Sequence, residues 1–222
     1  MLKDILPKIR TACDLCCGTG TTALELASHC ERVYGVDLSP LMCELARKKT
    51  RRARHPVRVI QADMRAFRLP EQVDLVTCEY DALNHVPAKE DLSRVARSVA
   101  RALRPGGYFY FDVNNQPAFQ KLWPRRWWME KRGVVLLMAG GYDADRNRGF
   151  TNVEWFVRAG RSWRRFHEYV EEVAWSASEM RRTLREAGFG TVRAWDAAPL
   201  MAGNTYIQPG YRTFYLARKL SA

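Results

Sequence analysis

Apolar and polar residues follow two different periods along the first half of the chain. Short apolar runs, typical of strands buried in a sheet, alternate with longer stretches in which apolar residues recur every three or four positions, as in helices. The strand-like runs are residues 11–15, 32–36, 57–61, 73–78 and 108–113, and the helical stretches are residues 21–30, 39–53 and 89–103. This alternation predicts a parallel sheet covered by helices.

The pattern changes after Asn114. Residues 117–132 are rich in Pro, Trp and Arg, and three strand-like runs follow, separated by turns rich in Gly, Asp or Asn. Neighbouring strands joined by short turns form an antiparallel meander, so we expect an insertion over the mouth of a site rather than more parallel core. The three runs are residues 133–139, 150–158 and 163–173.

The core pattern returns near residue 176. Ser176 and Glu179 have the spacing of a capping box, and Gly188 is placed to end the helix that follows. Residues 191–197 and 212–218 are the predicted closing strands. The chain is accordingly divided into a Rossmann-like core, an antiparallel insertion and a return to the core sheet, over residues 1–116, 117–175 and 176–222.

The end of the first strand carries the most specific chemical signal. Asp14 precedes a turn containing Gly18 and Gly20, and the second strand ends on Asp37. Such a strand, turn, helix and carboxylate bind a nucleoside through its ribose. A dinucleotide site usually has a third glycine where this chain has Ala23, and Asp14 would repel a pyrophosphate while attracting an ammonium group. These residues favour S-adenosylmethionine, which carries an ammonium, a sulfonium and two ribose hydroxyls.

Five stretches, in the expected order over residues 11–115, resemble the motifs of class I S-adenosylmethionine-dependent methyltransferases. They are residues 12–22, 34–39, 60–64, 74–85 and 103–109. The resemblance implies an α/β, Rossmann-like seven-stranded sheet, mostly parallel with the last strand antiparallel, and helices on both faces. Cys16 replaces a glycine of the family pattern, so its side chain must point away from the ligand or narrow the pocket.

The resemblance also implies how the cofactor is held. Asp14 would orient its ammonium group, Asp37 its ribose hydroxyls and Asp63 its adenine amino group. Two alternatives are open: Asp37 as a helix cap, although Ser39 is better placed for that role, and Asp63 as a partner of Arg65. The predicted cofactor-binding residues are Asp14, Cys16, Gly18, Gly20, Asp37, Leu38, Asp63, Met64 and Glu79.

Polar residues follow the fourth strand, where the resemblance places the transferred methyl group. Methyl transfer is an in-line displacement that needs a base only when the acceptor arrives protonated. Tyr80 would line the methyl region, and Asp81 or His85 would act as base or orient the acceptor. Equally open is a structural role, with Asp81 capping a short helix and His85 on its surface. Aromatic residues that would form the insertion's core or wall an acceptor pocket are Trp123, Trp127, Trp128, Trp155, Phe156, Trp163, Phe166 and Tyr169.

Composition narrows the class of protein. The 222 residues are 47% hydrophobic and 27% charged, as in an ordinary globular chain, and they contain no apolar run of membrane-spanning length and no signal-peptide pattern. We expect a cytoplasmic monomer or homodimer without a membrane partner. Cys13 and Cys16 form a C-x-x-C pair, but no second pair completes a zinc site, so no metal is predicted.

The net charge of +12 raises the question of a nucleic-acid partner. Basic residues gather in residues 47–54, and residues 124–128 form a basic-aromatic cluster that could stack bases. Neither an Asn/Asp-Pro-Pro-Tyr motif nor a Pro-Cys pair is present, so a small-molecule N- or O-methyltransferase is favoured over an RNA or tRNA methyltransferase. A third hypothesis is a non-catalytic S-adenosylmethionine-binding protein. It rests on Cys16 and on the ten residues before the first strand, where relatives usually carry a helix that closes the pocket.

Overall fold

A seven-stranded sheet forms the centre of the computed structural model, which describes residues 2–51, 55, 57–197 and 209–221. The described strands lie in the order β10-β11-β5-β4-β1-β2-β3, and β11 runs antiparallel to both of its neighbours while the other pairings are parallel. The strands are β1 (Thr11–Leu15), β2 (Arg32–Asp37), β3 (Val57–Gln61), β4 (Val73–Cys78), β5 (Leu103–Asn114), β10 (Phe189–Asp196) and β11 (Arg212–Lys219). The predicted fold class is confirmed.

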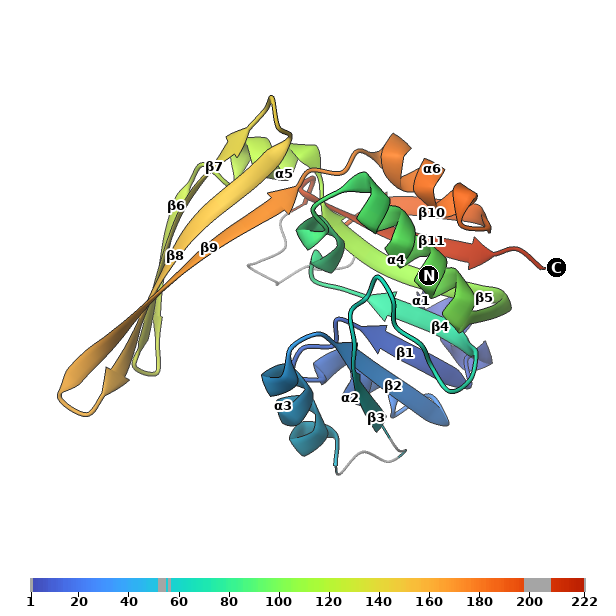
Figure 1. The fold of residues 1–222 in the computed structure, drawn as a ribbon. Coiled ribbons are helices and arrows are strands. Elements are labelled where there is room, and N and C mark those ends of the chain that lie inside the picture. Colours follow the sequence, from blue (N-terminus) through green and yellow to red (C-terminus); the bar gives the residue numbers. More distant parts are fainter. Residues whose placement is uncertain (1, 52–54, 56, 198–208, 222) are drawn as a thin grey trace.

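Helices cover both faces of this sheet (Figure 1). The long amphipathic helices α4 (Lys89–Ala102) and α6 (Ala177–Glu186) pack on one face, and α2 (Thr21–Leu26), which contacts α3 (Pro40–Thr50), packs on the other. The short helices are α1 (Leu2–Ile5), η1 (Leu6–Lys8), η2 (Ala82–His85) and α5 (Gln116–Lys121). None of the helices in the described ranges has the length and apolar character that a membrane span requires.

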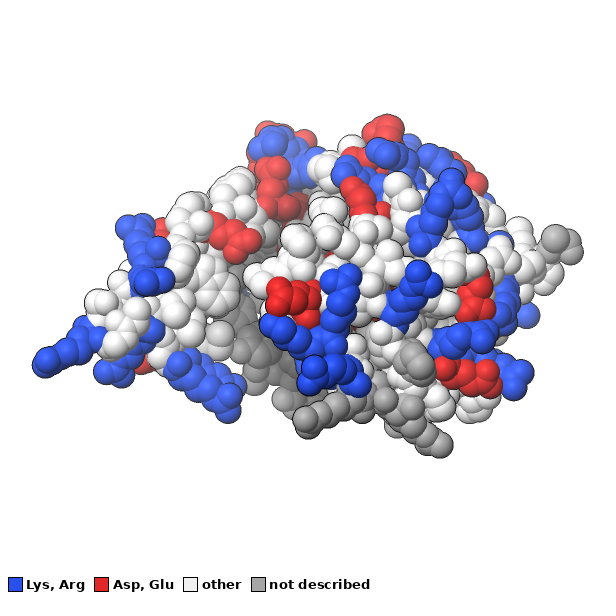
Figure 2. Space-filling model, turned by 60° about the horizontal axis from the view of Figure 1, so that its bottom comes forward, with Lys and Arg blue, Asp and Glu red and all other residues white. Residues whose placement is uncertain are grey.

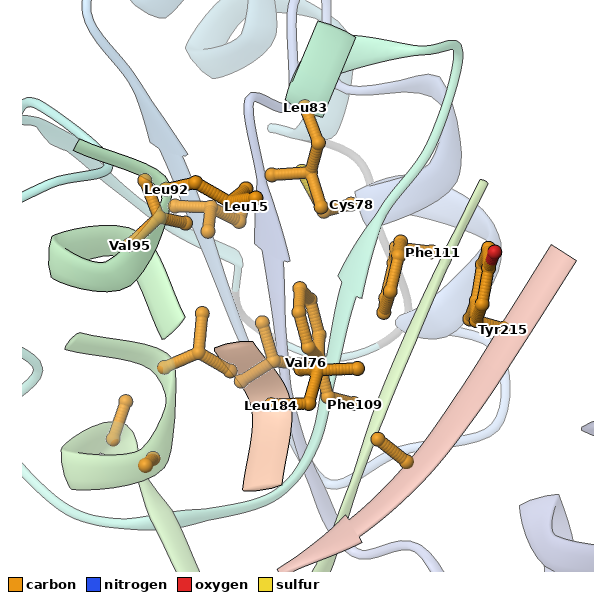
Figure 3. Close-up of a cluster of buried hydrophobic side chains, with 14 of the residues drawn as sticks. Leu15, Val76, Cys78, Leu83, Leu92, Val95, Phe109, Phe111, Leu184 and Tyr215 are labelled. Atoms are coloured by element: carbon orange, nitrogen blue, oxygen red, sulfur yellow. The ribbon is translucent and has the colours of Figure 1, made fainter. Parts of the chain in front are cut away.

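The larger core lies between the sheet and the α4–α6 layer (Figure 3). Leu92 of α4 lies toward Leu15 of β1, and Leu184 of α6 lies toward Val76 and Phe109; all five side chains are nearly inaccessible to solvent. Full burial of such side chains stabilises the fold by about 1.5–3 kcal/mol each. This core fixes the carboxyl ends of β1, β4 and β5, from which the functional residues project.

Most of the predicted boundaries agree with the structure. Ser39 caps α3 by accepting a hydrogen bond from the Met42 amide, and Ser176 and Glu179 form the predicted capping box of α6. The stretch predicted as a helix over residues 21–30 is shorter, because α2 ends at Leu26. The predicted end of α3, near residue 53, lies outside the described residues, and the helix as described ends at Thr50.

The insertion forms a separate antiparallel sheet with one more strand than predicted. Its strands are β6 (Arg126–Lys131), β7 (Val134–Asp143), β8 (Arg148–Ala159) and β9 (Ser162–Val173), in that order. Residues 126–131, to which no strand was assigned from the sequence, form strand β6. A two-residue hairpin turn joins it to β7, with φ of +52° at Arg132 and +76° at Gly133.

The second sheet projects away from the core, and its base is anchored beside the carboxyl ends of the central strands (Figure 1). At this base α5 packs against the sheet through Phe119, which lies so close to Gly149 that an added Cβ there would stand 2.3 Å from its ring. Glycine at 149 therefore permits the close approach of helix and sheet. The outer part of the sheet extends well beyond the core.

Candidate active site

The turn after β1 is held by the carboxylate at the end of β2. Asp37 Oδ2 accepts a hydrogen bond from the Gly18 amide at 2.8 Å, and its Oδ1 accepts one from the Ser39 amide at 2.9 Å. Gly18 and Gly20 have φ of +51° and +79°, a region that glycine occupies without steric cost. Asp37 thus braces the turn while its remaining lone pairs stay available for hydroxyl donors.

Cys16 adopts the left-handed conformation expected of the glycine it replaces. Its φ is +59°, which costs a residue with a Cβ about 1–2 kcal/mol. Its Sγ lies 3.8 Å from Met64 Sδ, and its side chain packs against the edge of the main core. Cys16 is also part of the lining of the adjacent cavity, so it both contacts the core and narrows the space beside the turn.

A cavity of about 380 Å³ opens between this turn, the start of α2 and the end of β4. We call it the turn cavity; its lining includes Asp14, Cys16, Gly18, Thr22, Glu79 and Tyr80. Asp14 is only 3% exposed, and its Oδ1 accepts a hydrogen bond from Thr77 Oγ1 at 3.0 Å. Its Oδ2 has no hydrogen-bond partner among the residues that the structure describes. A buried oxygen in that state is unfavourable, and a donor from a ligand would stabilise it.

The two acids of the turn cavity share an environment that suits a cation. Burial raises the pKa of Asp14 to about 7, and the charge of Glu79 adds to that shift. Burial also raises the pKa of Glu79 to about 7, with a further contribution from Asp112. A positive group placed between Asp14 and Glu79 would stabilise both ionised carboxylates.

Asp63 follows β3 and forms the ion pair considered as its alternative role. Its Oδ2 lies 2.6 Å from Nη2 of Arg65, and hydrogen bonds from Arg65 lower the pKa of the Asp63 carboxyl. The pair holds the loop that also carries Met64. A carboxylate accepts several hydrogen bonds, so a contact of Asp63 with an adenine amino group stays a prediction beside this ion pair.

Two consecutive strained residues follow β4. Tyr80 and Asp81 have φ of +59° and +54°, and their amides donate hydrogen bonds to the carboxylate of Asp112 at 2.7 and 3.0 Å. Asp112, on β5, is 1% exposed, and a guanidinium nitrogen of Arg212 from β11 also donates to it. Backbone strain of this kind persists only where the surroundings enforce it, and here Asp112 and Arg212 do so.

Asp81 belongs to a buried polar network that joins the core to the second sheet. Its Oδ1 accepts a hydrogen bond from Arg212 at 2.8 Å, and its Oδ2 accepts one from Asn114 at 2.9 Å. Asn114 also donates to Glu172 of β9 at 3.3 Å, and His85 Nε2 lies 3.5 Å from the other oxygen of Glu172. Burial raises the pKa of Glu172 to about 9, with the Asp81 charge as the next cause.

A larger cavity, of about 600 Å³, lies between this network and the second sheet. We call it the sheet cavity. Its polar end is formed by Tyr80, Asp81, Asn114, Glu172 and Arg212. Its apolar wall is formed by Leu122, Trp123, Trp127, Met138, Val153 and Val170. Tyr80 is the one residue in the described part of the chain that lines both cavities, so they meet at its side chain.

Comparison with known proteins gives this arrangement a family. The profile of a methyltransferase domain matches residues 12–107. The Bacillus subtilis protein YqeM, named as a methyltransferase, is 28% identical over 83% of this chain and 75% of its own length. The dTDP-4-amino-2,3,4,6-tetradeoxy-D-glucose N,N-dimethyltransferase of Saccharopolyspora spinosa is 25% identical over 77% of this chain, which spans 61% of that relative. A solved S-adenosylmethionine-dependent methyltransferase of Clostridium acetobutylicum has the same fold, with a TM-score of 0.86 and 23% identity over 100% of this chain and 89% of its own.

The chain therefore carries a methyltransferase domain over residues 12–107 and has the fold of solved S-adenosylmethionine-dependent methyltransferases. The cofactor of this methyltransferase is therefore S-adenosylmethionine, whose sulfonium supplies an electrophilic methyl group. The turn cavity offers such a molecule two carboxyl groups, those of Asp14 and Glu79, and the buried Oδ2 of Asp14 could accept a hydrogen bond from its ammonium group; that these residues hold the cofactor stays a prediction.

The structure brings the three residues predicted for catalysis to one place. Tyr80 stands between the cavities, Asp81 lies at the polar end of the sheet cavity, and His85 contacts Glu172. Asp81 occupies the N-cap position of η2, but its side chain makes no capping hydrogen bond, because Arg212 and Asn114 engage it. The capping role considered for Asp81 is therefore wrong, while the catalytic role stays a prediction.

Sequence reasoning missed four members of the network: Asp112, Asn114, Glu172 and Arg212. A signal existed for two of them, because Asp112 and Asn114 interrupt the apolar run of β5 at its carboxyl end, where ligands bind in such sheets. Glu172 and Arg212 carried no comparable signal, because only the folded chain brings β9 beside η2 and β11 beside β5.

Proposed function

We propose that this methyltransferase transfers a methyl group to a nitrogen or oxygen of a small organic acceptor bound in the sheet cavity. The observation that carries the proposal is the junction of the two cavities at Tyr80, one lined by acids and the other walled by aromatic and aliphatic side chains. A volume of about 600 Å³ lies in the range of pockets for small ligands, roughly 300–1,000 Å³. The name of the Saccharopolyspora relative, a sugar N,N-dimethyltransferase, supports an acceptor of this size.

The cofactor contacts are part of the proposal. Asp14 and Glu79 hold the ammonium group, and Gly18 and Gly20 let the backbone approach the methionine part. Asp37 accepts hydrogen bonds from the ribose hydroxyls. The adenine ring lies beside Asp63, between apolar side chains that follow the carboxyl ends of β2 and β3. Leu38, which is 64% exposed, and Met64 supply those contacts.

The proposed function also assigns a role to each of the three segments of the chain. Residues 117–175, which lie in the sequence between the two parts of the core, form the wall of the acceptor site. The chain's own residues have two tasks, to hold the acceptor atom in line with the methyl group and to exclude water. The aromatic wall and the closed polar end serve the second task.

An RNA acceptor has less support. Lysine and arginine side chains occur in several separate groups over the face shown in Figure 2, with acidic side chains between them. Two basic residues of the run 47–54 have partners within the protein: Arg47 donates a hydrogen bond to the Val59 carbonyl, and Lys48 forms a salt bridge with Glu44. Residues 52–54 of the run lie outside the described residues. Trp128, in the basic-aromatic cluster, is 71% exposed and is the feature best suited to stacking.

Label transfer tests the proposal. The purified protein is incubated with methyl-labelled S-adenosylmethionine and, separately, with pools of amines, hydroxyl compounds and total RNA. We expect label on small molecules and none on RNA. Transfer to RNA alone, with a salt-dependent gel shift, would favour the RNA hypothesis, and cofactor binding without transfer to any pool would favour the non-catalytic one.

A further inference from the structure

The charges at the polar end of the sheet cavity distinguish between classes of acceptor. We infer that the acceptor is a primary or secondary amine, held as an ammonium ion between Asp81 and Glu172 and freed of its proton there. The inference rests on the proposed function, and it selects nitrogen over oxygen as the methylated atom.

Carboxyl groups outnumber cations at this end of the cavity. Asp81, Asp112 and Glu172 approach one another with Arg212 as the guanidinium among them, bonded to Asp81 and Asp112. Asp112 is further satisfied by two backbone amides, whereas Glu172 accepts a hydrogen bond from the Asn114 amide group and contacts His85. A buried carboxylate without a cation is unfavourable, so this site gains from a positively charged ligand.

The positions of the oxygens place that ligand. The donor and acceptor atoms of Asp81, His85 and Glu172 lie within 4.8 Å of one another, a spacing that an ammonium group could bridge. The lining also includes Arg125, so three carboxyl groups face two guanidinium groups when the buried Asp112 behind the lining is counted. A phenolate or a carboxylate would be repelled by this end, whereas an ammonium would be attracted.

The apolar wall accommodates the remainder of such a molecule. Trp123 and Trp127 offer ring faces to a cation and to an apolar body, and Met138 and Val153 extend the same wall. An acceptor with an amine at one end and an apolar body at the other would match both ends of the cavity.

A protonated amine cannot attack, so its proton must leave first. The Asp81 carboxylate accepts it from the ammonium nitrogen and can pass it through Glu172 to His85, whose side chain is 48% exposed and reaches solvent. The freed nitrogen lone pair then forms the N–C bond to the methyl group while the C–S bond breaks and its electron pair remains on sulfur.

Matched acceptor pairs test the inference. Label transfer from methyl-labelled S-adenosylmethionine is measured with amine and alcohol partners of equal size, such as 2-phenylethylamine and 2-phenylethanol, beside smaller and larger pairs. We expect transfer to amines only. Asp81→Asn should lower the rate by about a hundredfold and flatten its dependence on pH, since a carboxylate base is lost. Label on the alcohols and not on the amines would overturn the inference and leave the proposed function standing.

Binding gives a second readout that does not need turnover. Quenching of tryptophan fluorescence is titrated with the same amines in wild type, Glu172→Gln and Glu171→Gln. Glu171 is the neighbouring residue on β9, on the opposite face of the strand, where it lies 3.4 Å from Arg146. We expect Glu172→Gln to weaken amine binding by about tenfold, as for loss of a charged hydrogen-bond partner, and Glu171→Gln to leave it unchanged.

The two readouts separate the failures. If S-adenosylmethionine binds but no compound in the panel is methylated, the proposed function is refuted, and the fluorescence titration still decides the inference. Equal binding of amines and alcohols, or equal affinity in both glutamate variants, would overturn it. Thermal melting shows whether each variant still folds. Repeating the fluorescence titration with a chelator shows whether a metal ion mediates amine binding.

Discussion

Three residues at the site have a backbone conformation that glycine would adopt without strain. Cys16, Tyr80 and Asp81 all have positive φ; the Cys16 thiol contacts Met64, and the amides of Tyr80 and Asp81 donate hydrogen bonds to Asp112. At Tyr80 and Asp81 the constraint is the buried carboxylate of Asp112, which binds both amides. Such residues mark places where the position of a side chain matters more than local stability.

Cys16 can be compared with a smaller and a branched side chain at the same position. Cys16→Gly removes the left-handed penalty and opens the turn cavity, so its cofactor affinity should equal or exceed that of wild type. Cys16→Val adds a β-branched side chain at the same φ and should lower the free energy of unfolding by about 1–2 kcal/mol and weaken the cofactor. Urea denaturation and calorimetry measure both; a Cys16→Gly variant that loses the cofactor would show that the thiol itself contributes.

Asp14 links cofactor binding to pH. Its carboxyl has a pKa of about 7 in the folded protein and near 4 when unfolded, so the folded state retains the proton between these values. The apo protein should therefore lose stability as pH rises from about 4 to 7. Asp14→Asn removes this ionisation, and at pH 8 it should be more stable than wild type, by at most about 4 kcal/mol.

The same variant should bind the cofactor poorly, because the amide cannot neutralise an ammonium group. Denaturation at pH 5 and pH 8 checks the first effect, and calorimetry at pH 8 checks the second. In wild type the affinity should also fall as pH drops below 7, where Asp14 and Glu79 become protonated. A stability difference between wild type and Asp14→Asn that is the same at both pH values would contradict this account.

At the scale of elements, the sequence predicts the strands and helices that have a local apolar periodicity and misses a strand that depends on pairing with its neighbour. The strands of the parallel core and the capped helices follow from apolar runs, Ser39 and Ser176, all of which act over a few residues. Strand β6 was missed because its Trp- and Arg-rich sequence gains strand structure only through pairing with β7. Tertiary pairing here decides what local propensity leaves open.

The contact of α5 with the second sheet shapes the wall of the sheet cavity. In Gly149→Ala the new methyl group would collide with Phe119 and Trp123, which would push α5 outward. We expect the free energy of unfolding to fall by about 1–3 kcal/mol and the KM for the acceptor to rise more than kcat falls, because Trp123 lines the cavity. Asn152→Ala, at an exposed position of the same strand, is the control. Unchanged stability in Gly149→Ala would mean that α5 is not packed as described.

At the scale of the whole molecule, the sequence predicts one of the two cavities. Much of the turn cavity is lined by one strand–turn–helix unit, which Asp37 braces from the next strand, so Asp14, Gly18 and Asp37 could be found in the sequence. The sheet cavity is assembled from the loop after β4, the end of β5, the segment after α5, the four strands β6 to β9, and β11. The pair of Asp81 with Arg212 joins residues 131 positions apart. No local pattern reports such a contact, and for that reason Glu172 and Arg212 were not predicted.

The net charge of +12 gives a further prediction at this scale. If the charge serves solubility and not RNA binding, methyl transfer to a small acceptor should change by less than about twofold between 50 and 200 mM salt, whereas binding through six or more phosphates would lose about a thousandfold in affinity. Activity over this salt range, with and without total RNA, makes the comparison. Inhibition by RNA at low salt that disappears at high salt would contradict the small-molecule proposal.

The proposed function depends above all on the turn between β1 and α2, which Asp37 holds and which we propose binds S-adenosylmethionine. Isothermal titration calorimetry of wild type, Asp37→Ala and the exposed-turn control Asp145→Ala tests it most directly. Asp37→Ala removes two backbone hydrogen bonds as well as the ribose acceptor, so a thermal melt must show that it folds. We predict one cofactor molecule per chain in wild type and Asp145→Ala and none in folded Asp37→Ala. Unchanged affinity in Asp37→Ala, or no binding by folded wild type, would contradict the account.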